Sequence, residues 1–263
     1  MRSSTLIVLA MFWLCPVTEA PAAPPAAAAA SADPLESARW GDMVKTFFAG
    51  ASVVFDARVK VVAPLIAEDS LNVPVSVDAS ELPGVEEVLV FADFNPILPV
   101  LRFQPMKARP ALAFRLKLQQ SSPVRAAART ADGVWHVGGA WITATGGGCT
   151  APSTGSGSPE WQERLNQVSG RIFPRTDGGE RLRMRVIHPM DTGLAPGIPV
   201  FHVEELSLGD ESGAELMRIR AYEPVSENPL FTIDLPAEAA AGTRIHARGR
   251  DNNGNRIDAW VTQ

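Results

Sequence analysis

The sequence predicts an all-β protein in which two β-sandwich domains follow one another, with a short helix before them. Apolar and polar residues alternate with a period of two along short segments in both halves of the chain, as in strands with one buried and one wet face. Asp132-Gly133 and Asn253-Gly254 lie between such segments, which is typical of hairpin turns. Glycine-rich residues 143–160 separate the halves, and short strands at this spacing favour sandwiches.

The N-terminal residues predict a signal peptide over residues 1–32. An apolar run at residues 6–14 follows Arg2, and it is too short to span a bilayer, which takes roughly 20 residues. Small residues then offer cleavage sites, of which we prefer the one after Ala32. A lipid anchor on Cys15 and a retained segment are the alternatives. Cleavage would remove Cys15 with the signal peptide.

The first domain is expected over residues 33–142. Residues 34–50 predict a helix that ends at Gly50, and one face of it would carry Leu35, Ala38, Met43 and Phe47. After the helix the period changes to two. Strands are expected at residues 53–61, 73–77 and 112–118, and on both sides of the Asp132-Gly133 turn.

The second domain is expected over residues 161–263, because strand patterns resume after the glycine-rich stretch. Arg181, Arg183 and Arg185 alternate with Leu182, Met184 and Val186, for example. Strands are expected at residues 181–187, 198–208, 214–222, 230–235, 243–250 and 255–261.

Residues 143–160 predict a flexible linker that carries Cys149. Gly146, Gly147 and Gly148 precede the cysteine and would act as a hinge, because glycine tolerates positive φ. If Cys15 is cleaved off, Cys149 is an odd cysteine in an exported protein, which points to an intermolecular partner or a reactive thiol. An inert buried cysteine is the alternative. The glycine-rich surroundings argue against burial, so we expect an exposed thiol.

Composition and motifs exclude several classes of function. The formal net charge of −5 and the absence of a Lys/Arg cluster exclude nucleic acid as a partner, and no long apolar run after the signal peptide predicts a membrane segment. His188, His202 and His246 match no metal-ligand spacing, so we expect no metal. The adjacent Glu68-Asp69 indicate a loop and not a catalytic carboxylate pair. The sequence contains no nucleophile elbow, phosphate loop or dinucleotide fingerprint, so neither an enzyme nor a cofactor is expected.

Several motifs resemble a known pair of families. Residues 59–75, "VKVVAPLIAEDSLNVPV", resemble SoxY, the sulfur-carrying subunit of the periplasmic carrier SoxYZ, and further likeness lies at Asn95-Pro96, Phe103, Asp132-Gly133 and Gly147-Gly148-Cys149. The second half resembles SoxZ at residues 186–193, 198–206, 226–235 and 250–255. In SoxY the glycine-cysteine arm ends the chain, whereas here the chain continues past Thr150-Ala151.

The resemblance implies two immunoglobulin-like β-sandwich domains and a periplasmic protein that carries cargo without being an enzyme. Cys149 would hold a sulfur-containing or other thiol-reactive intermediate covalently, as in thiosulfate oxidation, while partner oxidation enzymes act on it. Those partners would be Sox-type enzymes or a quinoprotein dehydrogenase system, since fused carriers of this kind are associated with such dehydrogenases. The alternative is a non-covalent adaptor or binding module for a periplasmic quinoprotein dehydrogenase.

Overall fold

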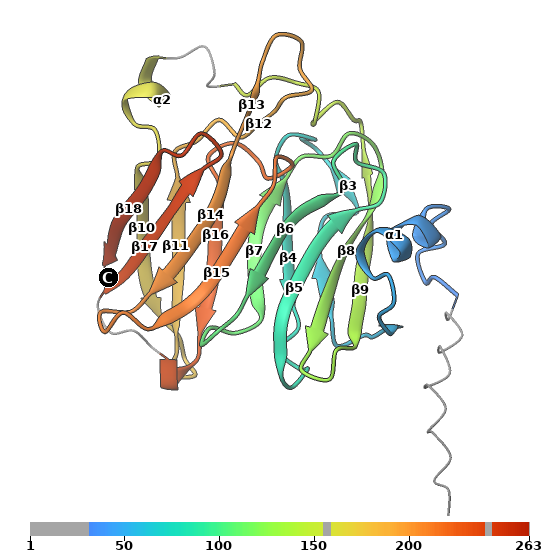
Figure 1. Ribbon diagram of the computed structural model, residues 1–263, viewed down its shortest axis with the longest axis horizontal. Helices are drawn as coiled ribbons and strands as arrows, with labels where there is room; N and C mark the ends of the chain where they lie inside the picture. Colours follow the sequence, from blue (N-terminus) through green and yellow to red (C-terminus); the bar gives the residue numbers. More distant parts are fainter. Residues whose placement is uncertain (1–31, 155–158, 240–243, 263) are drawn as a thin grey trace, which may run out of the picture.

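Two β-sheets face each other across one hydrophobic core in the computed structural model of the chain, shown in Figure 1. The structure describes residues 32–154, 159–239 and 244–262. The predicted signal peptide, residues 1–32, therefore lies outside the described residues except for Ala32. Within the described ranges the chain is mostly strand with two short α-helices, which confirms the predicted all-β sandwich fold. No helix among these residues is long and apolar enough to cross a membrane.

The larger sheet has ten strands among the described residues and runs through both halves of the chain. Its order is β1-β9-β8-β5-β6-β15-β14-β17-β18, and β3 pairs with the far end of β9. β1 and β3 run parallel to β9. The strands are β1 (Val53–Phe55), β3 (Ile66–Ala67), β5 (Val85–Ala92), β6 (Pro99–Gln104), β8 (Ser122–Thr130), β9 (Trp135–Ala144), β14 (Val203–Gly209), β15 (Glu215–Ala221), β17 (Arg244–Asp251) and β18 (Arg256–Thr262).

The smaller sheet has six antiparallel strands in the described part of the chain, in the order β10-β11-β16-β7-β4-β2. They are β2 (Lys60–Val62), β4 (Val73–Asp78), β7 (Ala111–Leu116), β10 (Val168–Pro174), β11 (Glu180–Val186) and β16 (Leu230–Leu235). A short pair, β12 (Asp191–Thr192) and β13 (Val200–Phe201), helix α2 (Pro159–Glu163) and the 3₁₀ turn η1 (Ala237–Ala239) complete the elements of the second half.

The two halves join edge to edge. In the larger sheet residues 101–104 of β6 pair with residues 218–221 of β15, and in the smaller sheet residues 112–113 of β7 pair with residues 232–233 of β16. We call these two pairings the seam. Because both sheets continue across the seam, the two sandwiches share one pair of sheets.

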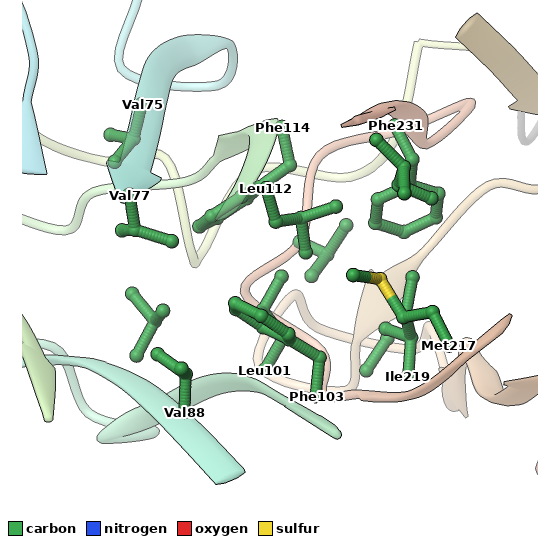
Figure 2. Close-up of a cluster of buried hydrophobic side chains, with 14 of the residues drawn as sticks. Val75, Val77, Val88, Leu101, Phe103, Leu112, Phe114, Met217, Ile219 and Phe231 are labelled. Carbon is green, nitrogen blue, oxygen red and sulfur yellow. The ribbon is translucent and has the colours of Figure 1, made fainter. Parts of the chain in front are cut away.

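The core between the sheets also crosses the seam. In β4, β7, β11 and β16 every second residue points into the core, as the alternation of apolar and polar residues predicted. Figure 2 shows side chains of the smaller sheet facing those of the larger sheet in one continuous cluster. Burying a side chain of this size stabilises the fold by about 1.5–3 kcal/mol. The labelled residues are Val75, Val77, Leu112, Phe114 and Phe231 on one side, and Val88, Leu101, Phe103, Met217 and Ile219 on the other.

Helix α1 (Trp40–Phe47) is shorter than the predicted helix at residues 34–50. The residues before it form turns instead, because the carboxylate of Asp33 accepts hydrogen bonds from the backbone N–H groups of Leu35 and Ser37. Ala38, which we expected on the apolar face, is exposed. The helix covers the outer face of the larger sheet, where Met43 packs in a second apolar cluster.

A buried ion-pair cluster fastens this N-terminal segment to the larger sheet. The guanidinium of Arg125 on β8 pairs with both oxygens of Asp33 at 2.8 and 2.7 Å, and its Nε lies 3.1 Å from Asp93. The ring centroid of Trp40 lies 4.6 Å from the guanidinium carbon, which adds a cation–π contact. Removing one partner from such a buried cluster costs about 3–5 kcal/mol, since the remaining charges lose their compensation.

Two local predictions have different outcomes. Asp132-Gly133 and Asn253-Gly254 lie in tight turns between paired strands, and Gly133 and Gly254 have positive φ, so both hairpins are confirmed. The prediction of a single strand at residues 53–61 is wrong, because this range contains β1 and the start of a second short strand, β2. The chain leaves the larger sheet after β1 and enters the smaller one at β2, because the Asp56 carboxylate binds the N–H of Arg58 and forms a turn.

We expect the two halves to associate without a covalent link. If the chain is cut between residues 154 and 159, the pieces should form a one-to-one complex, because the seam and the shared core do not depend on that segment. Co-expression followed by size-exclusion chromatography measures this. Two pieces that stay folded and separate at micromolar concentration would contradict the expectation.

Candidate functional site

Cys149 lies in a segment that crosses between the two halves of the molecule. In Figure 1 this yellow-green chain leaves β9 and runs over the top towards α2. Each of the three glycines is hydrogen-bonded on the way: Gly146 N–H to Ser70 Oγ at 3.1 Å, Gly147 N–H to the Gln119 carbonyl at 3.0 Å, and Gly148 N–H to the Leu118 carbonyl at 3.0 Å. We call residues 145–154 the arm. It occupies a defined seat in this structure.

The glycines fit this seat because they lack a Cβ. A Cβ on Gly148 would lie 2.1 Å from the carbonyl oxygen of Ser70 and 2.7 Å from that of Leu118, and one on Gly146 would lie 2.7 Å from the Gln119 carbonyl oxygen. Gly147 has open space around it but a φ of +83°. Close backbone approach and left-handed φ therefore account for the triplet in the seated arm.

The Cys149 side chain is fully buried, with no exposed surface. Its Sγ donates to the carbonyl of Lys117 at 3.7 Å, its N–H donates to Gln119 Oε1 at 3.2 Å, and its carbonyl accepts from Thr192 Oγ1 at 2.5 Å. The expectation of an exposed thiol is therefore wrong. Glycines make a chain flexible when it is unfolded, but they do not prevent it from packing in the folded protein. Here backbone and side-chain groups from both halves of the chain enclose the cysteine.

Lys117 is a buried lysine beside the thiol, and it is distant from Cys149 in the sequence. Its side chain is 1 % exposed and its Nζ donates to the Met190 carbonyl. Burial lowers the pKa of Lys117, while Asp191 and Cys149 act in the opposite direction. Burial also raises the pKa of the Cys149 thiol to about 11, with a smaller opposing effect of Lys117. The seated thiol is therefore protonated and unreactive at neutral pH.

Carboxylates of the second half hold the far end of the arm. Asp191 Oδ1 accepts from the Ser153 N–H at 3.0 Å. Glu227 Oε2 accepts from the N–H and the hydroxyl of Thr154 at 2.8 and 2.7 Å. The arm is thus bound at its glycines by the first half and after the cysteine by the second.

The motifs of the sequence analysis meet around this arm. The segment 59–75 supplies Ser70. Asn95 orders the seat, because its amide donates to the Lys117 carbonyl at 2.9 Å and its Oδ1 accepts from the Gln119 N–H at 2.9 Å. The segment 186–193 supplies the contacts of Asp191 and Thr192, and the segment 226–235 supplies Glu227. Each of these segments is recognisable in the sequence, but the sequence does not place them next to Cys149.

The other candidate residues have structural contacts. Asp69 lies in a loop, where its carboxylate accepts from the Leu71 N–H and the Asn72 amide, so the loop reading of Glu68-Asp69 is confirmed. His188 is buried and its Nδ1 accepts from the Met190 N–H at 3.0 Å. His246 pairs with Asp258. Among the described residues, no group of three or more His, Cys, Asp or Glu side chains is placed to hold a metal ion.

The fold and the arm together define a β-sandwich protein with an internal glycine-cysteine segment. Residues 44–149 match the family model of SoxY, described as "Sulfur oxidation protein SoxY". This match ends at Cys149 and confirms the resemblance of that segment to the SoxY family. A solved structure with similarity is the sulfur carrier protein SoxY from Chlorobium limicola f thiosulfatophilum, at 21% identity and a TM-score of 0.36, covering 41% of this chain and 96% of that chain. No curated protein matches the chain.

We expect the thiol to be protected in the folded protein. A pKa raised from 9.0 to about 11 lowers the thiolate fraction about 100-fold near neutral pH, so labelling of Cys149 with a disulfide reagent should be far slower than in urea. Gly148→Ala should speed the labelling, because the new Cβ collides with two backbone carbonyls and displaces the arm. Stopped-flow labelling measures both rates.

Gly147→Ala is the matched control for that variant. Its Cβ meets nothing within 4 Å, so the cost is limited to the positive φ, about 1 kcal/mol. It should speed labelling less than Gly148→Ala. Equal rates for native and unfolded protein, or no acceleration in Gly148→Ala, would refute the seated arm.

Stability should fall as the pH is lowered from about 6.5 towards 4. Burial lowers the pKa of His188 to about 4 from 6.5, and burial also lowers the pKa of His202. Between pH 6.5 and 4 the unfolded chain binds a proton at His188 that the folded chain does not, so His188 lowers stability by up to about 1.4 kcal/mol per pH unit, and His202 acts in the same direction. Urea unfolding across this range measures the slope, which should be smaller in His188→Gln. An unchanged slope in that variant would contradict the assignment.

Proposed function

We propose that the protein is an exported, periplasmic covalent carrier that holds a sulfur-containing or other thiol-reactive intermediate on Cys149 for partner oxidation enzymes. The observation that carries this proposal is that segments from both halves of the chain converge on the arm that holds Cys149. The match of residues 44–149 to the SoxY family, whose description names sulfur oxidation, supports it. The protein acts in the proposal as a carrier and not as a catalyst.

The seated arm is the resting form in this proposal. A partner enzyme reaches the sulfur only when the arm leaves its seat, which breaks the hydrogen bonds of the glycines and those of Ser153 and Thr154 with Asp191 and Glu227. Exposed peptide groups regain hydrogen bonds with water, so each of these bonds contributes only about 0.5–1.5 kcal/mol net. Release of the arm is therefore a local opening and not an unfolding of the sandwich.

Release also activates the sulfur. Outside its seat the thiol loses the burial that raises its pKa, so the thiolate fraction at neutral pH increases. One loading reaction then needs no additional oxidant: the thiolate attacks a sulfur of a cargo disulfide, a mixed disulfide forms, and the other half leaves as a thiolate. We propose Sox-type enzymes or a quinoprotein dehydrogenase system as the partners that process the bound cargo.

The burial of Cys149 favours a second candidate function. Full burial and a raised pKa are also expected of a cysteine that only packs in the core and takes no part in chemistry. In that case the protein is a non-covalent adaptor or binding module for a periplasmic quinoprotein dehydrogenase, and the glycines serve only the packing of the chain between the halves.

The two functions differ in what Cys149 carries in the cell. For the carrier, protein purified from the native periplasm should contain a fraction with added mass on Cys149 that reducing agent removes. Cys149→Ser should lose this mass and the oxidation activity that depends on the protein. Mass spectrometry measures the added mass on Cys149. Growth of the cells on the compound that the pathway oxidises measures the oxidation activity.

The control is that Cys149→Ser remains folded. A serine hydroxyl can donate to the Lys117 carbonyl as the thiol does. We therefore expect Cys149→Ser to lose only about 1 kcal/mol in stability. If the folded Cys149→Ser protein supports oxidation as well as the parent does, the carrier proposal fails and the adaptor takes its place.

A further inference from the structure

Four arginines lie together on the outer face of the smaller sheet. Arg171 on β10 is directly opposite Arg183 on β11, and Arg185 is the next residue of β11 on the same face. Arg115 on β7 lies two strands away from β11, across β16. All four side chains are exposed. Opposite residues are about 5 Å apart and same-face neighbours about 7 Å along a strand, so the four guanidinium groups can meet over one small area.

These arginines differ from the neighbouring ones in having no counter-charge. One step further along the same face, Arg181 pairs with Asp234 at 2.7 Å, and Arg175 pairs with the same carboxylate at 2.8 Å. In the described part of the chain, Arg115, Arg171, Arg183 and Arg185 form no ion pair. Like charges directly opposite one another destabilise a sheet, and this chain has a net charge of −5. The protein thus keeps a cluster of four arginines without ion pairs despite its acidic composition.

The four arginines line a groove of about 590 Å³. Its lining includes the polar side chains of Asn72 and Asn228, which can donate to an anion. The carboxylate in the lining is Glu227, which is already engaged by the N–H and hydroxyl of Thr154 and by the Asn228 amide at 3.3 Å. Glu227 keeps its negative charge, so an anion in the groove would meet four guanidinium groups against one carboxylate that is already hydrogen-bonded to neutral donors.

A second groove of about 540 Å³ adjoins the first. The two share Arg115 and Leu230 in their lining, and the lining of the second includes the apolar side chains of Val62, Pro64 and Pro74. A ligand whose charged group lies among the arginines can place an apolar part there.

We propose that the arginine groove binds an oxyanion of the sulfate, sulfonate or phosphate class, either free or as the charged group of a small organic ligand. Planar guanidinium groups bind such oxygens with two parallel hydrogen bonds each, and the bound anion supplies the missing counter-charge between Arg171 and Arg183. This site lies outside the enclosed seat of Cys149, and its binding of anions does not depend on the carrier function.

The test is calorimetric titration of the mature chain with sodium sulfate, with chloride adjusted to keep the ionic strength constant. We expect saturable binding of one sulfate per chain. Arg183→Gln should weaken it roughly tenfold or more, the effect of losing a charged hydrogen-bond partner. Arg181→Gln is the matched control, because its residue lies on the same strand and face but pairs with Asp234, and it should leave the binding unchanged.

A stability readout separates a binding site from a structural role. Arg183→Gln removes the repulsion with Arg171, so it should be at least as stable as the parent in chloride while losing the gain in melting temperature produced by millimolar sulfate. Titration with butanesulfonate and methanesulfonate then distinguishes the sources: tighter butanesulfonate binding means that the apolar groove holds part of an organic ligand, and equal binding or binding of sulfate alone means a free oxyanion.

Three outcomes would overturn the proposal. The first is that neither sulfate nor the sulfonates give saturable binding. The second is a sulfate effect that is undiminished in Arg183→Gln, since sulfate stabilises proteins in general at high concentration by exclusion from their surface. The third is binding of an oligoglutamate peptide that requires Arg183 while the small anions do not compete, which would make the groove a protein docking surface.

Discussion

The pairing of β6 with β15 and of β7 with β16 is the interaction on which the rest of the structure depends. It joins strands from two halves of the chain into common sheets, and so the apolar core continues from one half to the other. It also brings the end of β7, with Lys117 and Gln119, next to the 190–192 segment of the second half, and this junction encloses Cys149. The same pairing places Arg115 on one face with the arginines of β10 and β11. Both the seat of the arm and the arginine groove are therefore products of the seam.

Most strands can be predicted from the local sequence, because polar and apolar residues alternate in a strand that has one buried and one solvent-exposed face. β4, β7, β11 and β16 lie within or close to the ranges that their alternation predicts, and the two hairpins follow from glycines that adopt positive φ. Residues 85–92 carry no such alternation since the last residues of β5 are buried on both faces, one by the core and one by α1. The seam cannot be predicted from the alternation of polar and apolar residues either, because the residues of one strand do not show which distant strand pairs with it.

The site shows a different limit of sequence reasoning. The arm, its glycines and its cysteine are evident in the sequence, and the motifs that form the seat are recognisable one at a time. Their contacts are not, since Ser70, Lys117 and Thr192 come from three separate segments. Composition also misleads about exposure: a glycine is needed both where a chain must move and where two backbones touch. The second reason applies in the seated arm, as the short distances from a Cβ placed on Gly148 to the carbonyl oxygens of Ser70 and Leu118 show.

The complete enclosure of the Cys149 sulfur has a consequence for the proposed carrier function. The seat holds the bare thiol without exposed surface, against the backbone carbonyl of Lys117, and protein interiors are packed too densely to admit several additional atoms. An adduct on the sulfur would therefore keep the arm from returning. In the proposed carrier, the position of the arm would then report occupancy, with the empty form closed and the loaded form open. A partner that recognises the vacated seat could distinguish loaded from empty protein without contacting the cargo itself.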